Sequence, residues 1–160
     1  MKIAVIGTSG SGKTTLIDDF LGVHADYDHE QEPYWALAQQ GVPFADGPNV
    51  DDLAQQLEYS VAMILERSGD ERVIFDRSPI DFLAYLEVIG SREGFEWAPS
   101  ERQLARIEEA VTTLDLLVFL PLGRPDEITT RIEYPRLRLA VDRRLKAKVD
   151  YAVCEKLCLP

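Results

Sequence analysis

Cysteine is scarce in this sequence. Only Cys154 and Cys158 occur, close together near the end of the chain, where a helix would place both thiols on one face. A structural metal site would need two further ligands, and neither His24 nor His29 has a matching spacing. We therefore predict that the two cysteines are packing residues rather than a metal or redox centre.

Long apolar runs are missing too. No stretch approaches the roughly 20 apolar residues that a membrane-spanning helix requires. The first residues are typical of a strand followed by a loop, and they lack the charged and then apolar order of a signal peptide. With 46% hydrophobic and 28% charged residues, the composition is that of a soluble globular protein. We predict a cytoplasmic protein without a membrane partner, folded as one domain over residues 1–160.

Positive charge is the third shortage. The sequence has 17 Lys and Arg residues against 28 Asp and Glu residues, which gives a formal net charge of −11. Nucleic-acid-binding proteins present basic surfaces, so we predict no nucleic-acid partner and disfavour a polynucleotide kinase. The charge is uneven, because residues 18–32 hold six acids and no base while residues 124–148 hold eight basic residues. Two solvated faces explain most of these charges.

A glycine-rich loop near the N-terminus carries the strongest functional signal. The stretch GTSGSGKT, residues 7–14, matches the pattern G-x-x-x-x-G-K-[ST] at every position. The apolar run at residues 3–6 predicts a buried strand before the loop, and residues 15–17 open a helix after it. Because the motif binds phosphate in this strand–loop–helix context, we predict that the protein binds a nucleotide.

Each residue type in this loop suits phosphate. Glycine lets the backbone turn tightly and point N–H groups at phosphate oxygens, and the helix N-terminus adds a partial positive charge. Lys13 would reach the β- and γ-phosphates, and the Thr14 hydroxyl would ligate Mg²⁺. We therefore predict ATP and Mg²⁺ as cofactors, with the phosphates bound by Gly7, Thr8, Ser9, Gly10, Ser11, Gly12, Lys13, Thr14 and Thr15.

Strands and helices alternate along the rest of the chain. Apolar runs predict strands at residues 3–6, 72–76 and 116–120, all buried, and a short strand or extended segment within 24–32. Periodicity and capping residues predict helices at about 13–21, 50–67 and 79–89, followed by a loop at 90–99. A capping box at 100–103 begins the next helix. A further helix is predicted near 125–132, then a break at Pro135 and a last helix at about 137–157. This order predicts an α/β fold of the three-layer P-loop type, a parallel sheet with helices on both faces.

An acid ends one of the predicted strands. Parallel α/β sheets bind ligands beyond the carboxyl ends of their strands, and Asp76 follows the apolar residues 73–75. A carboxylate at this position would lie beside the metal held by Thr14. The alternative, capping of the next helix, is already available to Ser78. We predict that Thr14 and Asp76 are the metal ligands.

The stretch FDRSPIDFLAY, residues 75–85, resembles signatures of two kinase families. It is similar to the acid-Arg-Ser stretch of deoxyribonucleoside kinases and to the Asp-Arg-Ser-Pro stretch of AAA-type ATPase/kinase domains related to nicotinamide riboside kinases. In those families the acid lies by the magnesium, and the arginine faces the moving phosphate or the acceptor. The resemblance implies these roles for Asp76 and Arg77, whereas the residues alone leave open a salt bridge between Arg77 and a nearby acid.

The stretch EQEPYWAL, residues 30–37, looks like the Glu-Pro segment of nucleoside kinases, whose glutamate accepts the proton of the attacking hydroxyl. Glu32 is the matching position, although the spacing from proline to tryptophan is shorter here and Glu30 is an alternative. A carboxylate bonded to the hydroxyl would orient it in line with the γ-phosphorus. Tyr34 and Trp35 would then wall the acceptor pocket. The alternative is a solvated acidic loop with Trp35 in the core.

The segment RPDEITTRIEYPRLRLAVDRRL, which begins at Arg124, looks like the lid of these kinases. The positions that match the lid arginines are Arg131, Arg136 and Arg138, with one extra residue and an unusual proline between them. An arginine on the transferring group stabilises the charge of a loose transition state, and its planar fork suits a phosphoryl group better than lysine does. The resemblance implies an arginine-rich lid over about residues 124–138, and a solvated basic surface is the alternative.

Together these features predict a kinase that transfers the γ-phosphoryl group of ATP to a small hydroxyl-bearing acceptor, nucleoside-like by resemblance. An NTPase that directs Glu32 or Asp76 at water is the main alternative, and a non-catalytic regulatory nucleotide-binding protein is the third. A regulatory GTPase would need an Asn-Lys-x-Asp signature, which is absent. The sequence leaves open the acceptor, the choice of ATP over GTP and the oligomeric state, a homodimer included. The predicted catalytic residues are Lys13, Glu32, Asp76, Arg77, Arg131, Arg136 and Arg138.

Overall fold

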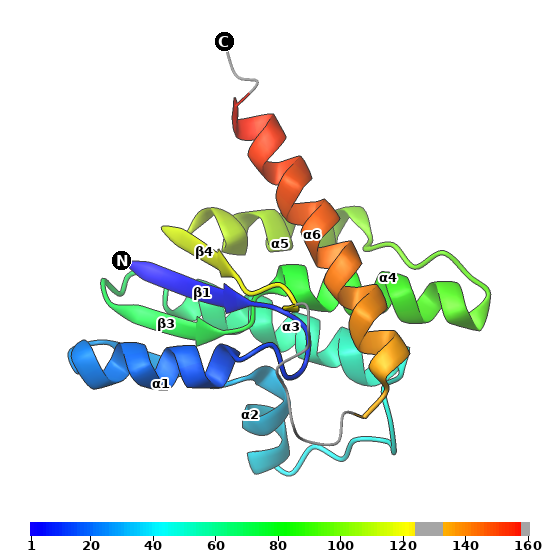
Figure 1. Cartoon of the computed structure of the whole chain (residues 1–160), viewed down its shortest axis with the longest axis horizontal. Helices are drawn as coiled ribbons and strands as arrows, with labels where there is room; N and C mark the ends of the chain where they lie inside the picture. Colours follow the sequence, from blue (N-terminus) through cyan, green and yellow to red (C-terminus); the bar gives the residue numbers. More distant parts are fainter. Residues whose placement is uncertain (124–132, 158–160) are drawn as a thin grey trace.

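Four parallel strands form the centre of the structure, a computed structural model that describes residues 1–123 and 133–157, with side chains described to residue 150. Within these residues the strands pair in the order β2-β3-β1-β4, and Figure 1 shows β3, β1 and β4 side by side. Their bounds are Lys2–Ile6 for β1, Asp28–Glu30 for β2, Val73–Asp76 for β3 and Leu116–Phe119 for β4. The parallel α/β architecture predicted from the alternation of elements is therefore confirmed.

Helices cover both faces of this sheet (Figure 1). One face packs against α1 through a small apolar cluster, and the other packs against α3, α4, α5 and α6 through the main core. The helices are α1 (Lys13–Val23), α2 (Pro33–Gln39), α3 (Val50–Glu66), α4 (Pro79–Glu93), α5 (Glu101–Thr112) and α6 (Pro135–Leu157). None of the helices in the described residues is long and apolar enough to cross a membrane.

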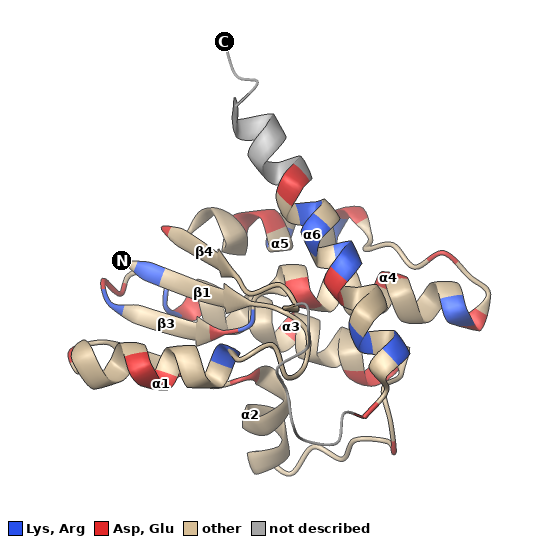
Figure 2. Ribbon diagram, viewed as in Figure 1, with Lys and Arg blue, Asp and Glu red and all other residues tan. Residues whose placement is uncertain are grey.

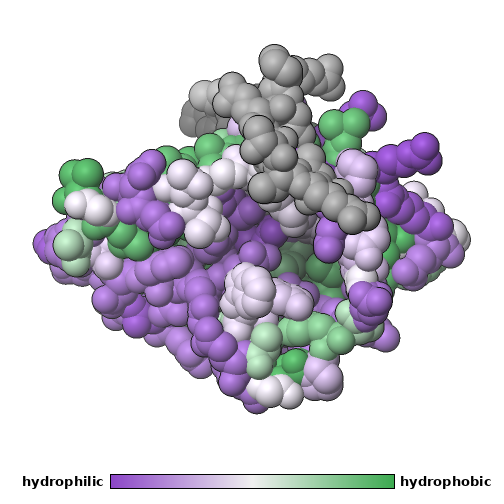
Figure 3. Space-filling view, turned by 60° about the horizontal axis from the view of Figure 1, so that its bottom comes forward, coloured by the Kyte–Doolittle hydropathy of each residue, from purple (hydrophilic) through white to green (hydrophobic). Residues whose placement is uncertain are grey.

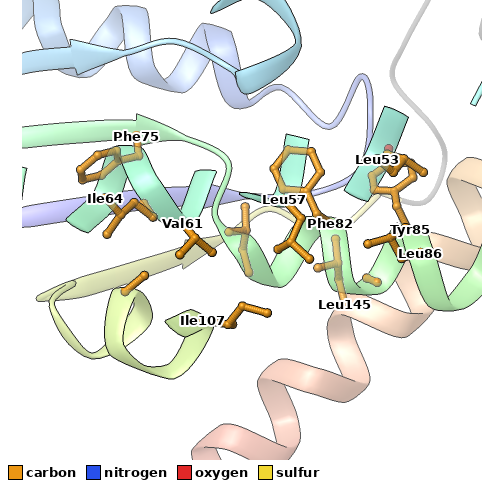
Figure 4. Close-up of a cluster of buried hydrophobic side chains, with 14 of the residues drawn as sticks. Leu53, Leu57, Val61, Ile64, Phe75, Phe82, Tyr85, Leu86, Ile107 and Leu145 are labelled. Atoms are coloured by element: carbon orange, nitrogen blue, oxygen red, sulfur yellow. The ribbon is translucent and has the colours of Figure 1, made fainter. Parts of the chain in front are cut away.

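The main core explains why α3 and α4 lie where they do (Figure 4). Residues one helical turn apart on α3, such as Leu57 and Val61, point at the same side and are at most 2% exposed. They meet Phe75 of β3 and Phe82 of α4, which are also almost fully buried. Burying each such side chain contributes roughly 1.5–3 kcal/mol, so this contact fixes α4 firmly behind β3.

The register of the sheet brings the carboxyl ends of β1, β2 and β3 together. Val5 lies opposite Asp76, so the acid that ends β3 stands beside the start of the glycine-rich loop. Glu30, the last residue of β2, lies opposite Phe75, and the chain reaches Glu32 and Arg77 two residues beyond that pair. The parallel pairing therefore places side chains far apart in sequence at one edge of the sheet.

Strand β4 differs from the prediction of a buried strand. Leu116 is 42% exposed, and the rest of the strand is half-buried. Among the described residues β4 pairs only with β1 and lies at an edge of the sheet, which leaves part of its surface uncovered. An apolar run shows that a strand forms, but it does not distinguish a central strand from an edge strand.

Several helix boundaries also differ from the predicted ones. The last helix, predicted from about residue 137, begins two residues earlier at Pro135, a position where the missing N–H of proline costs nothing, and residues 133–134 before it are not helical. Helix α4 continues beyond residue 89 to Glu93 and is closed by Gly94 at φ 89°, so the loop is shorter than predicted. Helix α2 was not predicted, since seven residues show too little periodicity. The helix predicted near 125–132 lies outside the described residues.

Candidate active site

The glycine-rich loop joins β1 to α1 as predicted. A turn closed by a hydrogen bond from the Ser11 N–H to the Thr8 carbonyl, at 3.2 Å, folds the loop, and Gly12 in the left-handed region (φ 94°) starts the helix. At Gly7 a Cβ atom would lie 2.8 Å from the carbonyl oxygen of Leu120, so any side chain there would clash with the backbone. The loop thus has the compact shape that directs backbone N–H groups at phosphate.

Lys13 lies inside this loop. Its side chain is buried, and its Nζ donates a hydrogen bond to the Thr8 carbonyl at 3.2 Å. Burial lowers the pKa of Lys13, and the nearby Arg77 guanidinium lowers it further, while the Asp81, Glu32 and Asp76 carboxylates act in the opposite direction. The ammonium is therefore a buried cation beside the loop, which is the position required to reach β- and γ-phosphates.

Thr14 and Asp76 come together as the sequence predicts. The Thr14 hydroxyl donates to Asp76 Oδ2 at 3.4 Å, while Asp76 Oδ1 is buried and has no hydrogen-bond partner among the described residues. Burial raises the pKa of Asp76, and the Lys13 ammonium partly offsets this. A hydroxyl beside a carboxylate oxygen without a partner fits Mg²⁺, which binds proteins through one or two oxygen ligands plus phosphates and water. The described residues contain no cluster of three or more His, Cys, Asp or Glu side chains that would form an all-protein metal cage.

Replacing Asp76 by asparagine tests this metal site. Asp76→Asn is expected to raise the Mg²⁺ concentration needed for half-maximal ATP binding by about 10- to 100-fold. The free protein should be at least as stable as the wild type, because the substitution removes a buried charge whose pKa is already raised. Titration with a fluorescent ATP analogue and thermal unfolding measure the two effects. Asp70→Asn, at a surface ion pair with Arg67, is the control, and an unchanged Mg²⁺ requirement in Asp76→Asn would remove Asp76 from the metal site.

Arg77 links the loop to the opposite side of the site. Its backbone has φ 81°, a conformation that is strained for a residue other than glycine, and its side chain is buried. The guanidinium donates to Glu32 Oε1 at 2.5 Å and to the Gly7 carbonyl at 3.1 Å. Burial alone would lower the pKa of Arg77, but the Glu32 carboxylate, Tyr85 and the Asp81 carboxylate hold it above its usual value. The salt bridge considered from the sequence therefore exists, and it lies within the site.

Glu32 stands at the start of α2 with its side chain 24% exposed. Burial would raise its pKa, but the charges of Arg77 and Lys13 outweigh burial and hold the pKa of Glu32 below its ordinary value. The carboxylate is therefore ionised at neutral pH. The alternative acid, Glu30, lies 3.4 Å from Arg67 and is not among the residues that line the neighbouring cavity. The structure thus brings Glu32, and not Glu30, to the loop.

Two residues of α4 that the sequence analysis missed also contact the loop. Asp81 Oδ1 accepts a hydrogen bond from the Gly7 N–H at 2.9 Å, and the Tyr85 hydroxyl accepts one from the Ser9 N–H at 3.0 Å. Burial raises the pKa of Asp81, and Arg77 counteracts it. The spacing offered a signal, since Asp81 and Tyr85 lie about one helical turn apart and share one face of the mostly apolar helix α4.

The three predicted lid arginines have different outcomes. Arg138 is buried, and its guanidinium donates to the Ser9 carbonyl at 2.7 Å and to the Gly10 carbonyl at 3.0 Å. Arg136 is exposed and does not line the cavity, so the structure does not bring it to the loop. Arg131 lies outside the described residues, as does most of the predicted lid over about residues 124–138.

Other basic residues of α6 have structural partners. Figure 2 shows several Lys and Arg residues along α6, which packs against α4. Arg144 and Lys148 both form ion pairs with Glu87 of α4, at 3.2 and 2.6 Å. The concentration of positive charge near the end of the chain therefore reflects, in part, the docking of α6 rather than a phosphate site.

A cavity of about 670 Å³ adjoins the loop and this cluster of charges. Figure 3 views the molecule from the side of α2, where a hollow with hydrophilic and hydrophobic walls opens. Tyr34 and Phe44 stack at 4.7 Å on one side of the cavity, and Phe82 lines another part. Trp35 is 58% exposed and also lines the cavity, so the alternative that placed it in the core is wrong. Glu32 and Arg77 lie in the cavity wall, next to Ser9 and Gly10 of the loop.

Solved structures show where this fold occurs. Deoxyadenosine kinase from M. mycoides with bound dATP is similar with a TM-score of 0.63 at 14% identity, over 97% of this chain and 87% of that chain. The same kinase with the products dCMP and a flexible dCDP bound gives 0.62 at 14% identity, over 96% and 85% of the two chains. The NadR protein in complex with NR gives 0.59 at 17% identity, over 94% of this chain and 40% of that chain. At such identities the likeness shows a shared P-loop kinase fold.

Sequence comparison gives the family. No curated protein matches the chain. The AAA domain family, in contrast, matches residues 2–159. This match runs over nearly the whole chain, from the first strand to the end of α6, and agrees with the fold seen in the solved structures. The chain therefore belongs to the AAA domain family, and it shares its fold with P-loop kinases.

Proposed function

We propose that this protein is an ATP-dependent kinase that transfers the γ-phosphoryl group to a hydroxyl of a small nucleoside-like acceptor. One observation carries the proposal. The ionised Glu32 carboxylate is held by Arg77 in the wall of a 670 Å³ cavity, at the point where that cavity meets the phosphate loop. A base, a phosphate site and a space for an acceptor thus lie together, which is the arrangement that in-line phosphoryl transfer requires.

In this mechanism the loop and Lys13 hold the β- and γ-phosphates. Thr14 and Asp76 would hold Mg²⁺, which would supply charge neutralisation on the phosphate oxygens. Glu32 accepts a hydrogen bond from the acceptor hydroxyl and orients it. The hydroxyl oxygen forms a bond to the γ-phosphorus, the bond from that phosphorus to the bridging oxygen breaks, and ADP leaves. Because the transition state is loose, the hydroxyl proton moves to Glu32 late, so a carboxylate with a low pKa suffices.

The cavity supports an acceptor with an aromatic base. Its stacked Tyr34 and Phe44 offer flat apolar surface, and its polar wall includes Gln56 and Asn49. The structurally similar proteins are a deoxyadenosine kinase and a protein in complex with NR, and both names agree with a nucleoside-like acceptor. Hydrolysis of ATP is the competing function, but a hydrolase needs room only for a water molecule at this position.

The test is ADP release from Mg-ATP, measured with and without a panel of nucleosides and ribosides. We expect at least one of these compounds to accelerate ADP release by more than tenfold over the rate without acceptor. ADP release that is equally fast with and without every compound would favour hydrolysis instead.

Arg138 provides a further test, because Arg136 on the same helix is a natural control. Arg138→Ala removes two charge-assisted hydrogen bonds to the loop carbonyls and should lower turnover roughly 30-fold while changing ATP affinity much less. Arg136→Ala should leave turnover within twofold of the wild type, since Arg136 is exposed and away from the cavity. Equal effects of the two substitutions in a steady-state assay would show that Arg138 acts only through general charge. Arg131, and with it the rest of the lid, remains a proposal.

A further inference from the structure

The Tyr85 hydroxyl makes several polar contacts with the phosphate loop. Its side chain is 7% exposed, and its hydroxyl oxygen lies 3.0 Å from the Ser9 nitrogen, 3.1 Å from Ser9 Oγ and 3.2 Å from Thr8 Oγ1. A phenol has one proton to donate, so the hydroxyl accepts from the Ser9 N–H and donates to only one of the two side chains at a time. One oxygen from α4 thus joins three polar groups of the loop.

The same side chain also belongs to the cavity. Tyr85 lines it, and the Arg77 guanidinium lies 5.4 Å from the centre of the Tyr85 ring. Burial would raise the pKa of Tyr85, but Arg77 and the hydrogen bonds from Ser9 and Thr8 outweigh burial and hold it below its usual value. Tyr85 therefore has two distinct parts, a ring on the acceptor side and a hydroxyl on the nucleotide side.

The loop segment that Tyr85 contacts is the one beside two cations. Lys13 Nζ donates to the Thr8 carbonyl at 3.2 Å, and Arg138 Nε donates to the Ser9 carbonyl at 2.7 Å. A rotation of the Thr8–Ser9 peptide would move the carbonyl that Lys13 contacts, and the carbonyl that Arg138 contacts belongs to the adjoining Ser9–Gly10 peptide. The Ser9 N–H of this segment donates its hydrogen bond to the Tyr85 hydroxyl. Losing that acceptor would free the peptide to rotate.

We propose that Tyr85 is a positioning residue: its hydroxyl fixes the Thr8–Ser9 segment in the conformation that receives the nucleotide, while its ring forms part of the acceptor wall. The contacts that carry this role are those of the hydroxyl with Ser9 and Thr8 and those of the ring with the cavity. The effect on transfer rests on the proposed kinase function. The effect on nucleotide binding rests only on the phosphate loop.

The substitution Tyr85→Phe separates the two parts, because it removes the hydroxyl and keeps the ring. We expect the dissociation constant for Mg-ATP, measured by calorimetry, to rise about tenfold, which corresponds to about 1.4 kcal/mol and lies within the range for a single hydrogen bond. Hydrogen exchange of the Ser9 amide in the free protein, followed by NMR, should become about tenfold faster. With an accepted nucleoside, kcat should fall while the acceptor KM stays within twofold. Tyr59→Phe is the matched control, since the Tyr59 hydroxyl contacts Gln40 at 3.5 Å, away from the loop.

The proposal would be overturned if the Tyr85→Phe protein folds and keeps both the wild-type ATP affinity and the wild-type rate of Ser9 amide exchange. A change confined to the acceptor KM would also overturn it. If the variant fails to fold, the wild-type protein still tests the proposal. Its Ser9 amide must be protected from hydrogen exchange in the absence of nucleotide, and rapid exchange there would contradict the positioning role of Tyr85. If the wild type phosphorylates no acceptor, the proposed kinase function fails, whereas ATP affinity and Ser9 exchange still test Tyr85.

Discussion

Lys13→Ala is expected to lower turnover by on the order of 100- to 1,000-fold. The reason is the loss of the Lys13 ammonium, which lies inside the phosphate loop, where Nζ contacts the Thr8 carbonyl. At a buried position such as that of Lys13, a positive charge stabilises the charge that develops on the transferring phosphoryl group far more than it would at the surface. The fold should survive, because burial already lowers the pKa of Lys13 and the substitution removes a costly buried charge.

Steady-state kinetics together with thermal unfolding test this expectation. Lys2→Ala serves as the control, since Lys2 Nζ contacts the Ser68 carbonyl at the opposite end of β1 and is exposed. Turnover of Lys13→Ala within two- or threefold of the wild type would mean that the loop is not the catalytic centre. Loss of the folded state would be seen in the melting curve and would be distinguished from loss of chemistry.

Glu32→Gln should reduce transfer to the acceptor by roughly 10²- to 10⁴-fold with little change in ATP affinity. Glutamine has the same size and can still contact Arg77, but it cannot take the hydroxyl proton and it orients the hydroxyl less strongly. The substitution also leaves the buried Arg77 guanidinium with a neutral partner, so some loss of stability is expected and should be measured separately.

Glu30→Gln is the matched control for that experiment. Glu30 is two residues earlier in the chain, but its carboxylate pairs with Arg67 outside the cavity. We expect transfer by Glu30→Gln to stay near the wild-type rate. A large loss in Glu30→Gln with none in Glu32→Gln would show that the assignment of the acceptor-side carboxylate is wrong by two residues.

The phosphate loop and the contact between Thr14 and Asp76 were predictable because their signals are local. The loop motif lies within one short stretch, and Asp76 is marked by the apolar strand that it ends. The Glu32–Arg77 contact, in contrast, joins residues 45 positions apart, and it depends on the parallel pairing of β2 with β3. The family resemblance named both residues, but only the fold shows that they touch.

The arginines of α6 show why a charged cluster could not be resolved from sequence. Arg136 and Arg138 are two residues apart, which on an α-helix is a rotation of about 200° and puts them on opposite faces. Which of them points inward depends on where the helix starts and how it packs. With the start predicted two residues too late, both were equal candidates, whereas the observed helix from Pro135 buries Arg138 and exposes Arg136.

Tyr85 was missed for a different reason. A tyrosine on an apolar helix is most often a core residue, and the ring of Tyr85 does pack in the core next to Phe82 and Leu86 (Figure 4). Only the position of α4 against the loop shows where the hydroxyl goes. Sequence patterns indicate which side chains are buried, but not which polar atom a buried side chain meets.

The most direct test of phosphoryl transfer is the product balance from ATP labelled in its γ-phosphoryl group. The protein is incubated with Mg²⁺, labelled ATP and the nucleoside or riboside that most accelerates ADP release, and the label is separated into phosphorylated acceptor and inorganic phosphate. A kinase with Glu32 directed at the acceptor hydroxyl predicts one phosphorylated acceptor for each ADP, with inorganic phosphate no higher than in the reaction without acceptor. If the amount of labelled inorganic phosphate equals the amount of ADP with every compound, the result would contradict transfer and identify the protein as a hydrolase.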